Sequence, residues 1–185
     1  MQENYVIEWL REYFGEPNLK EEKLKPILHF SLLWNLFEHT YYTDRDRLTP
    51  NTLNQLSVLS YDKVADEELE AIFLFFKKRY LSNDVFNSNF ENLKLNIRPY
   101  DQSMSDEEFC KRTLKDENPS KQDKNKCVLI IIYRFRNNLF HGRKNPLRLN
   151  IYEEPFQKIN KYLTHFINRT AKDDSINNNR FRSSN

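Results

Sequence analysis

The sequence predicts an all-α fold, a helical bundle in which a long insertion precedes one central helix. Apolar residues recur with helical spacing along most of the chain. The strict alternation of apolar and polar residues that marks half-buried strands is absent. Only 2 glycines occur among 185 residues, which disfavours a turn-dense β fold. A chain of this length suits one domain with its own core, and we assign residues 1–172 to that domain.

The N-terminal part predicts three helices. Residues 4–14 form a short, mostly apolar helix, and Gly15 is suited to end it because glycine readily adopts a left-handed conformation. Residues 21–42 form a long, broadly buried helix, which tolerates Pro26 because the proline stands near its start. A shorter helix that begins at a Thr-Pro pair covers residues 49–59.

A fourth helix and a long insertion follow. Residues 66–81 form the helix, with Asp66 as its N-cap and glutamates in the first turn, where carboxylates favour the positive end of the helix dipole. Residues 82–118 form an irregular insertion, asparagine-rich at first, with room there for one short helix or strand. Later in the insertion, the acidic run after Ser105 begins a small helix that ends near Lys115.

The central helix is predicted over residues 121–141, because the run from Cys127 to Tyr133 is the most apolar stretch of the chain. A last helix covers residues 152–169. Residues 173–185 are rich in Asn, Ser and Arg, and we expect them to be a disordered tail.

Composition limits the classes of partner and compartment. The 29 basic and 27 acidic side chains give a net charge of +2, so RNA binding requires a local basic patch rather than a basic surface overall. Cys110 and Cys127 have neither metal-binding nor redox spacing and are expected to be reduced thiols. We expect a cytoplasmic protein without a membrane anchor, since no apolar signal core follows Met1 and no segment is long and apolar enough to cross a bilayer.

The stretch from Tyr133 to Gly142 is the most informative part of the chain. It places two arginines, two asparagines and one histidine at the end of the apolar central helix. Arginine binds phosphate through a planar, permanently charged fork. Histidine exchanges protons near neutral pH, and Gly142 allows the helix to stop and expose the imidazole of His141. This combination suits cleavage of a phosphodiester bond.

The segment from Arg136 to Gly142 resembles the signature of the HEPN superfamily, in which a histidine follows an arginine by a few residues and a polar residue usually comes directly after the arginine. The aromatic stretch at residues 30–38 resembles the helix that precedes this motif, and the likeness of the helical frame covers residues 21–169. The resemblance implies a helical, commonly dimeric domain. Many such domains are metal-independent endoribonucleases that act as toxins or in antiviral defence. Others are noncatalytic modules that bind RNA or proteins.

Two features leave the assignment of the arginine open. Arg134 and Arg136 both fit the spacing, and Arg136 is preferred because Asn137 follows it. In one regular helix, Arg134 and His141 project about 20° apart, whereas Arg136 and His141 project about 140° apart. A two-fold dimer would bring Arg136 of one copy to His141 of the other, as the resemblance also implies. The toxin branch with a tyrosine two residues after the histidine is not indicated, because Arg143 stands there.

The expected mechanism is attack of the ribose 2′-OH on the adjacent phosphate. His141 exchanges the proton, Arg136 stabilises the charge on the phosphate oxygens, and Asn137 orients either the histidine or the phosphate. No metal or cofactor is expected, since Asp and Glu are absent from residues 127–152. A substrate-binding rim is expected from the polar side chains around this motif: Arg134, Asn138, Arg143, Lys144 and Arg148.

The alternative reading is a noncatalytic HEPN-like module in which the same residues form only a polar helix end. In either case the expected partners are RNA, a second copy of the chain, and an antitoxin or regulatory protein. His29 and His165 lie in apolar helices and are expected to be packed, and His39 is expected at a surface. Trp34 and Tyr133 have the shape to stack on a base, but core packing is their expected role.

Overall fold

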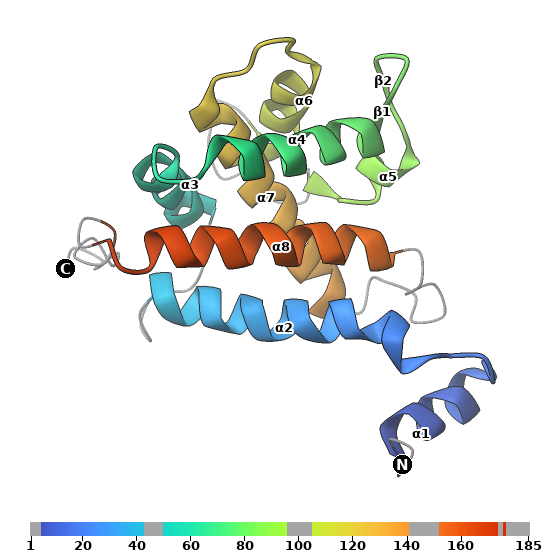
Figure 1. Cartoon of the computed structure of the whole chain (residues 1–185). Helices are drawn as coiled ribbons and strands as arrows, with labels where there is room; N and C mark the ends of the chain where they lie inside the picture. Colours follow the sequence, from blue (N-terminus) through green and yellow to red (C-terminus); the bar gives the residue numbers. More distant parts are fainter. Residues whose placement is uncertain (1–4, 43–49, 96–104, 141–151, 174–175, 177–185) are drawn as a thin grey trace.

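The computed structural model describes residues 5–42, 50–95, 105–140, 152–173 and 176, and within these ranges it confirms the all-α class. Eight helices and one two-stranded hairpin make up the described elements (Figure 1). None of the described helices is both long and apolar enough to cross a bilayer.

The helix α7 (Lys121–Phe140) is the centre of the fold, as expected from its apolar run. Its residues from Cys127 to Ile132 are all buried, because neighbours surround the helix on several sides. Helices α3 (Pro50–Ser60), α4 (Asp66–Tyr80) and α6 (Asp106–Lys115) all pack against it. The polar end of α7 therefore lies at the edge of a rigid core.

The helices α2 (Glu21–Tyr41) and α8 (Glu153–Thr170) lie side by side along most of their lengths (Figure 1). Aromatic rings join them, with Phe30 5.0 Å from Phe156 and Phe37 5.8 Å from Phe166 between ring centroids. Near the end of α2, the hydroxyl of Tyr41 is hydrogen-bonded to that of Thr170. This pair of helices packs against the central helix and closes the core.

The insertion is more regular than expected in its first part. Strands β1 (Leu81–Ser82) and β2 (Val85–Phe86) form an antiparallel hairpin, and helix α5 (Ser88–Glu91) follows. Asn83 and Asp84 connect the strands with φ values of 51° and 60°. Two left-handed residues in a two-residue connection match the right-handed twist of the strands, and Asn and Asp tolerate that conformation well.

Helix α6 begins where expected, at an acidic run after Ser105. The hydroxyl of Ser105 accepts a hydrogen bond from the backbone N–H of Glu108, and the Glu108 carboxylate accepts one from the Ser105 N–H, both at 3.2 Å. This reciprocal capping box satisfies two backbone donors at the helix start.

Three expectations are corrected. Asp66 is not an N-cap, because α4 starts at Asp66 itself and Ala65 occupies the cap without a side-chain bond. His29 is exposed rather than packed, because it lies on the outer side of α2. The expected disordered tail includes Ile176, which is buried in the core. The rest of residues 174–185 lies outside the described residues.

Helix α1 (Tyr5–Phe14) lies beyond the start of α2 and is set off from the rest of the bundle (Figure 1). Ile7 is buried, and Arg11 Nε donates a hydrogen bond to the carbonyl of Leu19 at 2.9 Å. The helix is therefore attached along one side.

Candidate functional site

The end of α7 carries the described half of the predicted site. Four of the expected site residues are described there, and they are Arg134, Arg136, Asn137 and Asn138. The remaining four lie outside the described residues, and they are His141, Arg143, Lys144 and Arg148.

Arg134 is buried and serves the insertion rather than a surface rim. Its side chain is 7% exposed, and Nη2 donates to the carbonyl of Leu95 at 3.2 Å. The same nitrogen lies 3.6 Å from the carboxylate of Asp106 at the start of α6. Burial raises the pKa of Asp106, and the charges of Arg134 and Lys126 only partly offset this effect. Arg134 thus contacts Leu95 and Asp106, two residues on either side of the segment that leads from α5 to α6.

Asn138 is also turned inward, with 6% of its surface exposed. Its Nδ2 donates to the carbonyls of Asn92 at 3.2 Å and Leu93 at 3.3 Å. These carbonyls follow α5, so the two hydrogen bonds attach the turn after α5 to α7. Arg134 and Asn138 are therefore buried and bonded to the insertion, whereas the sequence analysis expected them in a substrate-binding rim.

Arg136 lies on the opposite side of α7 and remains partly accessible. Two residues of an α-helix project about 200° apart, so Arg134 and Arg136 face different neighbours. Arg136 Nη2 lies 3.4 Å from the Glu38 carboxylate on α2, and Nη1 donates to Oδ1 of Asn137 at 3.2 Å. The guanidinium also lies over the ring of Phe140, 5.4 Å from its centroid.

These contacts fix the Arg136 guanidinium without enclosing it. The side chains of Arg136 and Glu38 are 28% and 32% exposed. Arg136 Nε is covered and has no hydrogen-bond partner among the described residues. A guanidinium that is held in place, partly exposed and adjacent to an amide can bind two oxygens of a phosphate.

Glu38 is a neighbour of Arg136 that the sequence analysis did not identify. An acidic residue near the end of the apolar helix α2 was the available signal. The sequence could not reveal its partner, because 98 positions of chain separate Glu38 from Arg136. Trp34 is 2% exposed, with its ring centroid 6.4 Å from that of Tyr133. The structure confirms the expected core role of Trp34.

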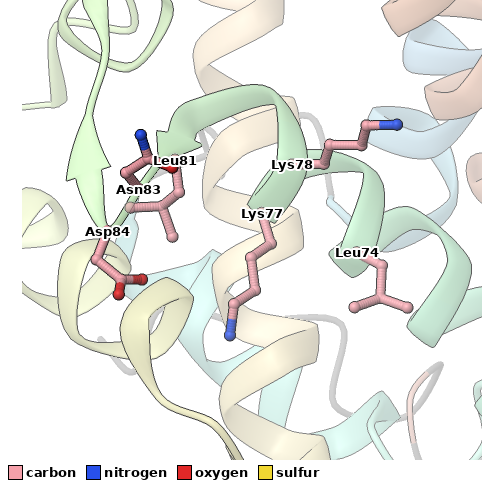
Figure 2. Close-up of a pocket in the computed structure, with 6 residues that line it drawn as sticks. All are labelled: Leu74, Lys77, Lys78, Leu81, Asn83 and Asp84. Carbon is pink, nitrogen blue, oxygen red and sulfur yellow. The ribbon is translucent and has the colours of Figure 1, made fainter.

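A separate pocket of about 450 Å³ lies between the end of α4 and the β1–β2 hairpin (Figure 2). Lys77 and Lys78 point in different directions there, and Lys77 Nζ donates to the carbonyl of Asp116 at 2.8 Å. Leu74 and Asp84 also line the pocket, whereas the motif residues do not. This pocket is therefore separate from the candidate site.

The residues that the structure describes form no candidate metal site. No group of three or more His, Cys, Asp or Glu side chains comes together there. Cys110 and Cys127 are both buried, and burial together with the neighbouring Cys127 raises the pKa of the Cys110 thiol. A thiol with a raised pKa is a poor metal ligand and a poor nucleophile.

The candidate site is therefore the polar end of α7, with Arg136 held by Glu38, Asn137 and Phe140. Compared with known proteins, the chain has no match among family models, curated proteins or solved structures.

Proposed function

We propose that this chain is a metal-independent endoribonuclease and that it acts as a toxin or antiviral-defence effector in the cytoplasm. The observation that carries the proposal is the Arg136 guanidinium, which is partly exposed and held at the end of the central helix, five positions before His141. The resemblance of residues 136–142 to the HEPN motif adds support. The choice between the two arginines favours Arg136, because Arg134 is buried against Leu95 and Asp106.

The proposed reaction is transesterification within RNA. His141 takes the proton of the ribose 2′-OH, and the 2′ oxygen forms a new bond to the adjacent phosphorus. The bond between phosphorus and the 5′ oxygen breaks, and that oxygen receives a proton. The products are a 2′,3′-cyclic phosphate and a 5′-hydroxyl end. Arg136 stabilises the charge that grows on the nonbridging oxygens.

Glu38 and Asn137 prepare Arg136 for this role. The Glu38 carboxylate holds the guanidinium in place. The side-chain oxygen of Asn137 accepts a hydrogen bond from Arg136 Nη1, so the Asn137 amide lies beside the guanidinium. A planar fork held in advance loses little freedom when phosphate binds. Arg143, Lys144 and Arg148 extend the cationic rim for the RNA backbone in this proposal.

A composite site in a homodimer completes the proposal. Arg136 and His141 point to different sides of a regular helix, so one helix does not easily direct both at one phosphate. A two-fold axis beside the end of α7 would pair the Arg136 of each copy with the His141 of the other. An antitoxin or regulatory protein would act by covering this site.

The proposal is tested by RNA cleavage with purified protein in the presence of EDTA. His141→Ala should lower turnover by about 10²–10⁴-fold, the usual share of a general acid or base. Arg136→Lys should lower it by about 10²–10³-fold, because an ammonium cannot reproduce the planar fork. A 2′-deoxy substitution at the cleaved position should abolish cleavage, because the nucleophile is lost.

Matched controls are available in the same chain. His29→Ala removes an exposed histidine and Arg112→Lys changes an exposed arginine, both far in sequence from the motif, and both variants should keep wild-type turnover. Full activity of His141→Ala, or activity that disappears in EDTA and returns with magnesium, would contradict the mechanism.

A noncatalytic RNA- or protein-binding module is the second candidate. The observation that favours it is the ion pair with Glu38, which already supplies Arg136 with an anion. Glu38→Gln separates the two functions. An enzyme whose Glu38 positions the guanidinium should lose turnover in this variant. A binding module whose Arg136 is released should gain affinity for RNA and show no cleavage in either form.

A further inference from the structure

Helix α2 has a second apolar face that nothing described covers. Leu28, Leu32 and Leu36 are 53%, 71% and 46% exposed. Their spacing of four residues places them in one row on the side of α2 opposite its buried residues, which include Phe30 and Phe37. We name this row the leucine stripe. Three large aliphatic side chains in line on one helix form an interaction surface rather than scattered surface leucines.

Helix α1 carries a matching row of aromatic side chains. Tyr5, Trp9 and Tyr13 are 77%, 47% and 68% exposed and also follow one another by four residues. The rings of Trp9 and Tyr13 stack at 4.9 Å between centroids, so they present one continuous surface. We name this row the aromatic stripe. It lies on the opposite side of α1 from Ile7, which attaches the helix to the bundle.

The short length of α1 favours further packing of its outer side. The helix has 10 residues, and isolated helices shorter than about 12–15 residues are marginal in water. One row of contacts around Ile7 leaves most of its aromatic surface in solvent. Packing of the aromatic stripe would supply the missing stabilisation.

We propose that the aromatic stripe of one chain docks on the leucine stripe of a second copy, with the reciprocal contact formed across a two-fold axis. Each copy carries both stripes, and the three residues of each stripe follow one another by four positions. An isologous dimer therefore covers all four stripes of the two copies. The proposal rests on the proposed function only for its expectation of a dimer. The surface itself follows from exposure and spacing.

The available area suits a stable dimer. The six side chains of the two stripes are between 46% and 77% exposed. Fully covered aromatic side chains bury about 150–250 Å² each, so the two stripes together supply an area on the order of the roughly 800 Å² per partner of specific interfaces. Scattered surface side chains do not reach this area in one contact.

The charges beside the stripes are complementary. Lys25 stands one turn before Leu28, and His39 stands one turn after Leu36, both exposed. Glu12 is exposed beside the aromatic stripe. An antiparallel crossing, which opposes the two helix dipoles, places Tyr13 against Leu28 and brings the end of α1 that carries Glu12 toward the start of α2 that carries Lys25. Attraction between these charges selects the orientation.

The first test measures oligomeric state by sedimentation of the full chain across the micromolar range. The wild-type protein should be a dimer, and Leu32→Glu should be a monomer with an unchanged helical spectrum, because Leu32 is 71% exposed. Leu74→Glu is the matched control, since Leu74 is 51% exposed on α4, and it should remain a dimer. Lys25→Glu and Glu12→Lys should each weaken the dimer, and their combination should restore part of it.

The second test identifies the partner directly. Trp9→Cys and Leu32→Cys change the middle residue of each stripe, so the two thiols meet in either helix orientation. Mixing the two single variants under mild oxidation should give a disulfide-linked pair, while mixing Trp9→Cys with Leu74→Cys should not. The native Cys110 and Cys127 do not interfere, because both are buried.

Other outcomes overturn the inference. A wild-type monomer, a dimer that Leu32→Glu leaves intact, or equal disruption by Leu74→Glu would each remove the leucine stripe from the interface. A monomeric Leu32→Glu protein that still cleaves RNA would support the interface between the stripes and contradict only the composite site. Full cleavage by His141→Ala with the dimer preserved would contradict the proposed function and leave the interface between the stripes unaffected.

Discussion

Two arginines two positions apart have different roles because their surroundings differ. Arg134 is 7% exposed between Leu95 and Asp106, whereas Arg136 is 28% exposed beside Glu38. Removing one partner from a buried ion pair leaves the other charge without compensation. An ion pair near the surface contributes little, because water screens both charges.

At this scale we predict that Arg134→Ala lowers the free energy of unfolding by about 3–5 kcal/mol, whereas Arg136→Ala lowers it by about 0–1 kcal/mol. Urea unfolding of both variants at the same protein concentration provides the measurement. Equal losses would show that the two arginines share one structural role.

The helices themselves follow from local signals. The expected bounds of α2, α4, α6 and α8 differ from the observed ones by one residue or less at either end. Apolar periodicity and cap residues act over a few positions of chain, so a single sequence reveals them. The hairpin of β1 and β2 was less predictable, because two strands of two residues each have too few positions to show alternation.

Polar contacts between helices were not predictable in the same way. Asn125 on α7 is fully buried, and its Nδ2 donates to the Ser57 carbonyl and the Ser60 hydroxyl on α3, each at 3.0 Å. Its Oδ1 accepts a hydrogen bond from the Tyr162 hydroxyl on α8 at 2.7 Å. Burial raises the pKa of Tyr162, so this hydroxyl remains a donor.

For these three helices we predict that Asn125→Ala lowers the free energy of unfolding by about 3 kcal/mol, since each buried group left without a partner costs about 1–3 kcal/mol. Thermal and urea unfolding should both show the loss. Gln122→Ala is the control on the same helix, because Gln122 is exposed, and it should change stability by less than about 0.5 kcal/mol. Similar losses in both variants would mean that helix propensity, rather than the buried contacts, explains the effect.

The whole molecule is held together by an aromatic core that joins α2, α7 and α8. Trp34 lies at its centre, with ring centroids 5.0 Å from Phe37 and 6.4 Å from Tyr133. Its indole Nε1 is buried without a hydrogen-bond partner among the described residues. The contribution of Trp34 therefore comes from packing rather than from a polar contact.

On this basis Trp34→Ala should lower the free energy of unfolding by about 3–5 kcal/mol, as expected for a large cavity. Trp34→Phe should cost much less, because the ring still fills most of the space and no hydrogen bond is lost. Leu74→Ala, at an exposed position of α4, should have a small effect. Chemical unfolding of the three variants checks the order, and a Trp34→Phe loss as large as that of Trp34→Ala would point to an undetected polar role of the indole.

The sequence by itself determined the all-α class, the order of the helices, and the location of the polar motif at the end of the helix that contains the apolar run from Cys127 to Tyr133. These features depend on spacing within one element, which the chain displays directly. Only the tertiary structure decided which arginine stays accessible. Residues 134 and 136 differ little in sequence context, but they face the insertion and α2 respectively. Pairs such as Arg136 with Glu38 join distant parts of the chain, and their existence depends on how the helices pack.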